Sequence, residues 1–186
     1  MFQEHYDALF SMDFVETKYP HDKTMKGLGI FDDVELVLKN MHLAWFLSHR
    51  MESYKELTCE FLDSLRYHRY EEEDRAYLDQ GLGWITFLAD GVKKEVTFSQ
   101  LEILFDFNYG EGTEWKFKKR ELQSVWTTIV EGVYSSSRSK NAQIRSPVLR
   151  YVHKALANTF FARKATCKIT EGELQLLDMG IKPILP

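Results

Sequence analysis

The chain has 186 residues, of which 44% are hydrophobic and 14% aromatic, and it carries a formal net charge of −4. This apolar content is sufficient for a folded core, which excludes a disordered chain. No stretch approaches the ~20 consecutive apolar residues of a membrane helix, and the acidic N-terminal segment is unlike a signal peptide. We therefore expect an intracellular protein, nuclear or cytoplasmic, with no membrane partner.

Three segments are predicted along the chain. Residues 1–23 show no firm hydrophobic period and end in Tyr19-Pro20, which indicates a leader that docks or frays. Residues 24–165 are predicted to form the main helical domain. Residues 166–186 are predicted to form a divergent C-terminal helix and tail.

Two helices are predicted early in the main domain. The first begins at Asp32, because Asp32 and Glu35 have the spacing of a capping box and apolar residues then recur every three or four positions up to Trp45. The second begins at Ser53, with Glu56 three residues later, and also carries an apolar face.

The hydrophobic period changes in the middle of the chain. Residues 84–89 are aromatic and β-branched, and Asp90-Gly91 is a tight-turn dipeptide before a second short run. This pattern predicts a β-hairpin near 84–98. Ser99 is then expected to cap a short helix, and apolar residues on one side predict another helix over about 118–131.

A polar loop separates the last helices. Residues 134–145 are rich in Ser, Arg and Lys, with Ile144 as the single buriable residue. Ser146-Pro147 predicts the start of a helix, because Ser is a good N-cap and Pro fits the first helical position. Thr170 is expected to cap a last helix that ends near Gly180. The predicted fold class is therefore α+β, mainly α-helical, with about six helices and one hairpin.

The charge is unevenly distributed. Residues 132–170 contain eight Lys or Arg and no acid, which leaves 16 basic and 28 acidic residues elsewhere, a balance of −12. We call residues 138–168 the basic segment. Its cations surround a predicted helix N-terminus, where they are unfavourable unless an anion joins them. The predicted phosphate-binding residues are Arg138, Lys140, Arg145, Ser146, Arg150, Lys154, Arg163 and Lys164.

Such contacts would position DNA or RNA through its backbone without reading its sequence. The alternative is that these cations pair with the protein's own acids, for example residues 71–74, or are simply solvated. His153 is expected on the polar side of its helix, as a surface histidine or an anion contact. Trp115 is expected to be a core anchor, with base stacking as the alternative.

No catalytic, metal-binding or cofactor-binding motif is found. Asp32 and Asp33 superficially resemble the acidic turn of reverse transcriptases, but they precede a helical pattern, and helix capping accounts for them better. The histidines form no zinc-binding pair. We expect no enzyme activity, no metal and no cofactor.

Three stretches carry a family resemblance: residues 28–35 (LGIFDDVE), 54–65 (YKELTCEFLDSL) and 136–159 (SSRSKNAQIRSPVLRYVHKALANT). Together they resemble the first-open-reading-frame proteins of Athila-type plant retrotransposons, of the gypsy class. Residues 96–105 are more weakly similar to the plant mobile domain. The resemblance spans about Tyr19 to Arg163, departs from the family after Lys164, and has Ser146 where the family usually has Asn.

The resemblance implies a plant transposable-element product, or a host gene derived from one, and it carries over no catalytic residue. The expected function is a non-enzymatic module that binds nucleic acid. One alternative is an assembly protein, capsid-like or oligomerising, in which the basic segment meets the acidic surface of another copy. Another is a nuclease or integrase accessory, which would need clustered carboxylates.

Overall fold

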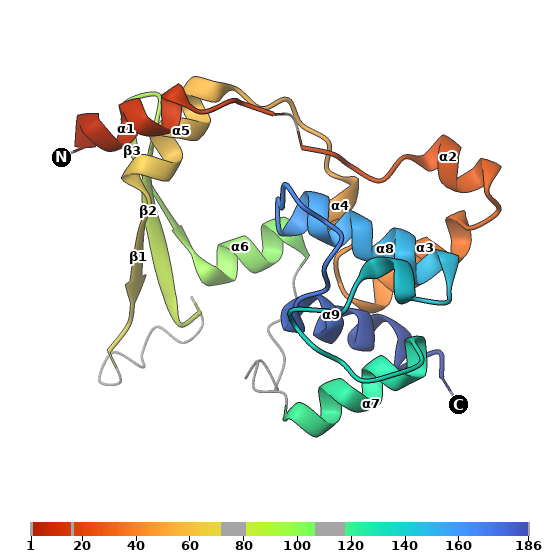
Figure 1. The fold of residues 1–186 in the computed structure, drawn as a ribbon. Helices are drawn as coiled ribbons and strands as arrows, with labels where there is room; N and C mark the ends of the chain where they lie inside the picture. Colours follow the sequence, from red (N-terminus) through yellow and green to blue (C-terminus); the bar gives the residue numbers. More distant parts are fainter. Residues whose placement is uncertain (1, 16, 72–80, 107–117, 186) are drawn as a thin grey trace. The chain divides into compact units, whose positions relative to one another are not determined.

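The computed structural model describes residues 2–15, 17–71, 81–106 and 118–185 (Figure 1). Within them the fold is α+β, with nine α-helices and a three-stranded antiparallel sheet. The predicted fold class is confirmed, but the count of about six helices was too low. The three helices that were missed are α1 (Phe2–Ser11), α2 (Asp22–Gly27) and α4 (Ala44–Ser48), which are too short or too irregular in sequence to show a clear period.

The contacts between residues group the chain into two compact units that alternate along the sequence. Unit 1 comprises residues 1–16 and 51–107, and unit 2 comprises residues 17–50 and 108–186. The predicted leader is therefore shared between the two units. The predicted boundaries at residues 23 and 165 stay a prediction.

The sheet of unit 1 has the order β1-β2-β3, with β1 at Arg66–Arg69, β2 at Gly83–Ala89 and β3 at Val92–Thr97. The predicted hairpin is confirmed: Ala89 lies opposite Val92, and the turn residues Asp90 and Gly91 both have positive φ, as in the turns that match strand twist. Strand β1, which pairs with β2, was not predicted because its sequence, Arg-Tyr-His-Arg, lacks an apolar alternation.

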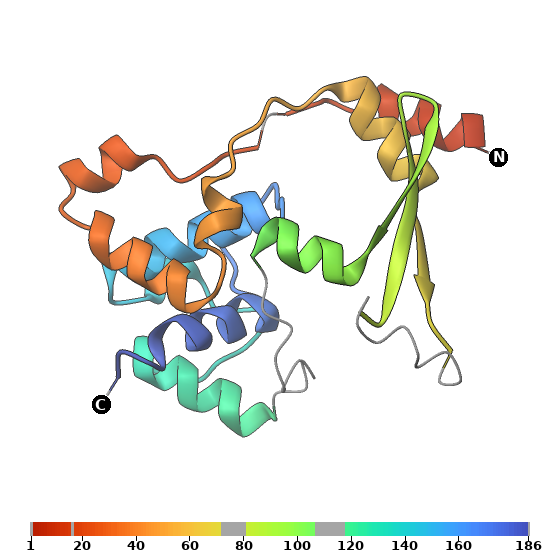
Figure 2. The same cartoon turned by 180° about the vertical axis from the view of Figure 1, so that it is seen from behind.

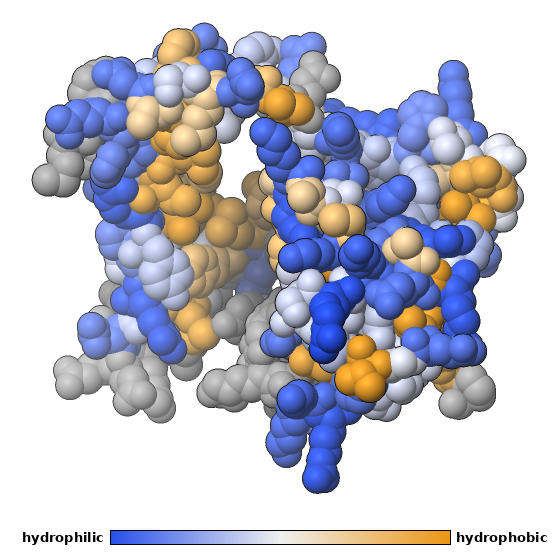
Figure 3. Space-filling model, in the orientation of Figure 1, coloured by the Kyte–Doolittle hydropathy of each residue, from blue (hydrophilic) through white to orange (hydrophobic). Residues whose placement is uncertain are grey.

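Helices that precede and follow the strands in the sequence pack on this sheet. Helix α5 (Lys55–Ser64) contacts both α1 and β2, and the ring centroids of Phe61 and Phe87 are 4.8 Å apart. Helix α6 (Phe98–Phe105) is capped by Thr97 in a capping box with Gln100, so the predicted cap at Ser99 was wrong. Figure 3 shows apolar side chains along the strands of unit 1.

The cap predicted at Ser53 was also wrong. Helix α5 follows Tyr54, and no side chain caps it. In unit 2, α3 (Phe31–Asn40) likewise begins without a side-chain cap, so Asp32 does not have its predicted role. Asp32 and Asp33 are exposed in the first turn of α3, where their charge offsets the helix dipole. The described residues contain no cluster of His, Cys, Asp and Glu able to hold a metal ion.

Unit 2 is a helical body. Helix α3 contacts α8 (Pro147–Ala155) and α9 (Glu171–Ile181), and α9 also contacts α7 (Lys119–Ile129). Figure 2 shows α7 and α9 side by side from behind. Fully buried side chains from these elements and the segments between them form the core: Trp126, Ile144, Leu156, Ile169, Leu174 and Leu177.

Helix α9 crosses α3 at Gly180. A Cβ atom at this position would lie 2.7 Å from Cγ1 of Val37 and from Cε of Met41. Asn40 donates a hydrogen bond from Nδ2 to the Gly180 carbonyl oxygen at 2.9 Å. The prediction that this helix ends near Gly180 is confirmed, since α9 ends at Ile181. Gly180 itself lies in the last turn and permits close packing against α3. None of the helices in the described part of the chain combines the length and apolar character that crossing a membrane requires.

Candidate nucleic-acid interface

The start of α8 is built as its sequence predicts. The Ser146 hydroxyl accepts a hydrogen bond from the Leu149 N–H at 3.3 Å, and Pro147 is the first helical residue. Proline has no N–H to leave unpaired, so the pair suits a helix N-terminus. Val152 and Ala155 are buried on the inner side of α8. Arg150 and Lys154, one turn apart, are exposed on the other.

The loop before α8 is fixed by its backbone. Ser139, only 2% exposed, receives a hydrogen bond from the Ser135 N–H on its hydroxyl and one from the Ile169 N–H on its carbonyl. Lys140 forms an antiparallel bridge with Lys168. The prediction that Ile144 is buried is confirmed, but it was wrong that Ile144 is the only buried loop residue.

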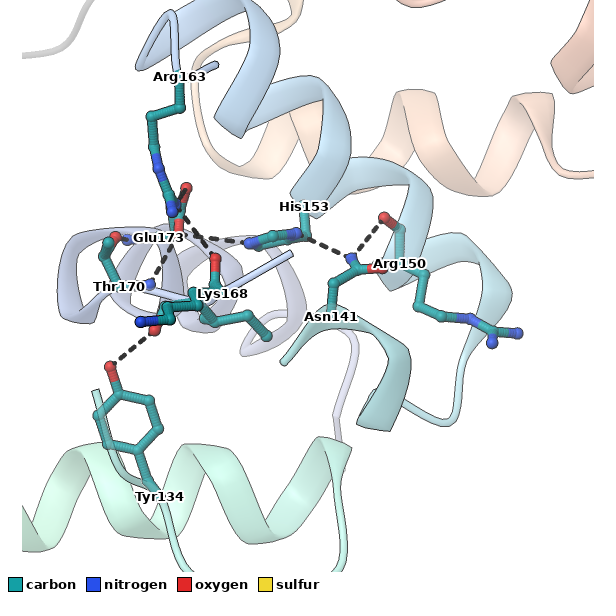
Figure 4. Close-up of polar contacts among 9 residues, drawn as sticks. Tyr134, Asn141, Arg150, His153, Arg163, Lys168, Thr170 and Glu173 are labelled. Carbon is teal, nitrogen blue, oxygen red and sulfur yellow. Dashed lines mark hydrogen bonds and ion pairs between the residues drawn. The ribbon is translucent and has the colours of Figure 1, made fainter. Parts of the chain in front are cut away.

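A network of hydrogen-bonded polar side chains connects residues of the basic segment with α9 (Figure 4). Asn141 donates from Nδ2 to the Arg150 carbonyl oxygen at 3.0 Å and contacts Nδ1 of His153 at 2.8 Å. The second nitrogen of His153, Nε2, lies 3.3 Å from Oε2 of Glu173. The other carboxylate oxygen of Glu173 accepts a hydrogen bond from Arg163.

His153 was therefore predicted wrongly: it is fully buried and cannot be a surface histidine. The amide of Asn141 donates both its hydrogens, one to the Arg150 carbonyl and one to Nδ1 of His153. Since Nδ1 accepts, the ring proton belongs on Nε2, facing Glu173. Sequence reasoning missed Asn141 and Glu173, because nothing in their spacing shows that they meet His153.

Glu173 lies at the centre of this network of polar side chains. Burial alone would raise its pKa, but hydrogen bonds from His153, from the Thr170 N–H and from Arg163 outweigh burial and lower the pKa to about 2. Glu173 also forms a capping box with Thr170, which confirms the prediction that Thr170 caps this helix. Nearby, burial and the charges of Glu171 and Glu173 raise the pKa of Tyr134 to about 12, and its hydroxyl donates to the Ile169 carbonyl oxygen at 3.2 Å.

Two cations of the basic segment have internal partners. Arg145 lies 3.5 Å from Oε1 of the exposed Glu131 and donates to the Thr128 carbonyl oxygen. Arg163 is three-quarters buried and bonded to Glu173 and to the Lys168 carbonyl oxygen. A phosphate would have to share the Arg163 guanidinium with these internal bonds.

The remaining cations of the segment are exposed. No carboxylate of the described residues lies within ion-pair distance of their charged groups. They are Arg138, Lys140, Arg150, Lys154, Lys164 and Lys168. The acids at residues 72–74, considered above as partners, lie outside the described residues, as does Trp115.

The structure therefore brings the predicted residues together in groups. Arg145, Ser146, Arg150 and Lys154 lie at the start and on the exposed side of α8, and Lys140 lies beside Lys168. In Figure 4 the Arg150 side chain points away from the network of polar side chains, and the Arg163 side chain points into it.

Comparison with family models gives one match, the ATHILA ORF-1 family, over residues 1–186. This extent corrects the expectation that the likeness ends after Lys164. No curated protein and no solved structure matches the chain.

Proposed function

The chain belongs to the ATHILA ORF-1 family and is thus retrotransposon-derived, and from this premise we propose that it is a non-enzymatic module that contacts nucleic-acid phosphates through the basic segment. The family is not a known enzyme family. The proposed contact residues are the exposed cations of the segment, with Arg145 and Ser146 at the start of α8.

One observation carries this proposal: six cations of a segment without a single acid are exposed and have no carboxylate partner among the described residues. Surface cations gain little from isolated ion pairs, but they gain much from a polyanion, because each phosphate contact releases condensed counterions. The buried hydrogen bonds of Asn141 and Glu173 hold the backbone of the segment, so that binding would not have to order it first.

The experiment is a salt titration of affinity. Fluorescence anisotropy would measure binding of a labelled DNA duplex and of a single-stranded RNA between 50 and 300 mM salt. For duplex DNA, the double variant Arg150→Gln/Lys154→Gln should bind more weakly, and the slope of log affinity against log salt should fall by about 2.

The matched control is Lys93→Gln/Lys94→Gln, which removes two exposed cations from β3 in unit 1. This control should bind as the parent does. Equal weakening of both variants would mean that binding reflects net charge alone, and a slope near zero for the parent would contradict phosphate contact altogether.

The second candidate is assembly, capsid-like or oligomerising, and the charge distribution favours it. Residues outside 132–170 carry a balance of −12, so the basic segment of one copy could meet the acidic surface of another. Light scattering without nucleic acid separates the two functions. A large oligomer that dissociates in salt supports assembly, and a monomer that retains nucleic acid supports binding.

A further inference from the structure

Unit 1 contains an acidic pocket of about 420 Å³ beside α5 and the β2–β3 turn. Four carboxylate side chains line it: Glu56, Glu60, Asp63 and Asp90. No Lys or Arg is among the described residues that line it. A pocket of this kind has a strongly negative interior, and it lies in the unit that does not contain the basic segment.

Glu60 is fixed by the hairpin turn. Its carboxylate accepts one hydrogen bond from the Asp90 N–H and one from the Gly91 N–H, each 2.7 Å long. Both turn residues have the positive φ that this backbone geometry needs. Each carboxylate oxygen has a second lone pair, so Glu60 can accept further hydrogen bonds from a ligand without moving.

Asp63 provides a second reason to regard this pocket as a binding site. Its side chain is only 10% exposed, and its Oδ1 atom accepts no hydrogen bond from the described residues. Nδ1 of His5 lies 3.9 Å from this oxygen, on a side chain that is 70% exposed. A buried carboxylate oxygen without a donor is costly, and this one belongs to a side chain that lines the pocket.

We propose that this pocket binds the cationic side chain of an arginine or lysine from a partner protein. The guanidinium or ammonium group would donate to the carboxylates of Asp63 and Glu60, which both line the pocket. Leu57 and Leu88, which also line the pocket, suit the aliphatic stem of such a side chain. Arginine offers five N–H donors, which matches several carboxylates around one site.

Two further features fit an organic cation. The described residues contain no cluster with the arrangement that a metal ion needs. Burial raises the pKa of Tyr6, which lines the same pocket, and the carboxylates of Glu56 and Glu60 raise it further. The pocket recognises positive charge and lies outside the basic segment, so this inference does not rest on phosphate binding.

Backbone amide signals provide the test, because the Asp90 and Gly91 N–H groups bond directly to Glu60. The ¹⁵N-labelled protein would be titrated with arginine and lysine blocked at both ends, with blocked glutamine as the neutral control and with spermidine as a free polyamine. Blocked arginine or lysine should shift both amides saturably, and glutamine should not.

The variants are Asp63→Asn, which is nearly isosteric, and Glu56→Gln at an exposed position of the pocket. Each should weaken binding, the first by about tenfold or more, as for the loss of a hydrogen bond to a charged group. Glu95→Gln on β3 should leave the affinity unchanged. The proposal is overturned if neither blocked amino acid binds saturably, if only spermidine does, or if both pocket variants bind like the parent.

Discussion

Glu173 is the residue on which the position of the basic segment most depends. It is fully buried, yet it accepts hydrogen bonds from the backbone of Thr170 and from Arg163 and faces His153. Its partners come from α8 and from the segment that follows α8. One carboxylate thus ties the start of α9 to α8 and to the segment that follows α8.

Replacing Glu173 by Gln should lower the free energy of unfolding by about 3 kcal/mol at pH 7, since a pKa lowered from 4.5 to about 2 corresponds to that energy. A lowered folded-state pKa means that the stabilisation is complete above pH 4.5 and is lost as pH falls through about 2. Urea unfolding would measure the difference in the free energy of unfolding between parent and variant. This difference should narrow from about 3 kcal/mol at pH 7 to about 1 kcal/mol at pH 3.

The control for this variant is Glu171→Gln, in the same turn of α9 but exposed. Its stability should stay close to that of the parent at both pH values, because surface charges contribute little. A Glu173→Gln variant as stable as the parent at pH 7 would show that the buried carboxylate does not hold this part of the fold.

At the scale of elements, helix periodicity was the strongest signal in the sequence. The six predicted helices correspond to α3, α5, α6, α7, α8 and α9. Caps were predicted less well. Ser146 and Thr170 are caps, but Asp32 and Ser53 are not. Asp32 lies inside the first turn of α3, where acids are also favoured, and Ser53 lies one residue before Tyr54, which α5 follows.

Gly180 shows what periodicity cannot reveal. A glycine near a helix end predicts a C-cap, but here it lets α9 approach α3. Gly180→Ala should destabilise the protein by about 1–2 kcal/mol, because overpacking against Val37 and Met41 exceeds the gain in helix propensity. Thermal or urea unfolding would measure this loss.

Gly27 in α2 provides the matched control. A Cβ atom at Gly27 would meet nothing within 4 Å, so Gly27→Ala should be neutral or slightly stabilising. If both alanine variants proved equally stable, the close crossing of α3 and α9 would not be important for the fold.

At the scale of the whole molecule, composition revealed the uneven distribution of charge but not which cations have partners within the protein. Counting residues is enough to find eight cations in a segment without acids. Which of them have internal partners depends on contacts between distant residues, such as Arg163 with Glu173 and Arg145 with Glu131. The two-unit division was also invisible, since each unit is assembled from separate stretches of sequence.

The net charge of −4 would suggest repulsion from nucleic acid, but charges act over only about 8–10 Å at physiological salt. The affinity for nucleic acid should therefore depend on the local charge of +6 from the unpaired cations and not on the net charge of the protein. The salt slope of duplex binding should not exceed about 5 if each of these cations meets one phosphate. Neutralising acids of unit 1, as in Glu52→Gln/Glu95→Gln, should leave that slope unchanged, because the number of phosphates contacted is the same. A slope that rises with the net charge of such variants would mean that the whole-molecule field governs binding and that the basic segment is not its site.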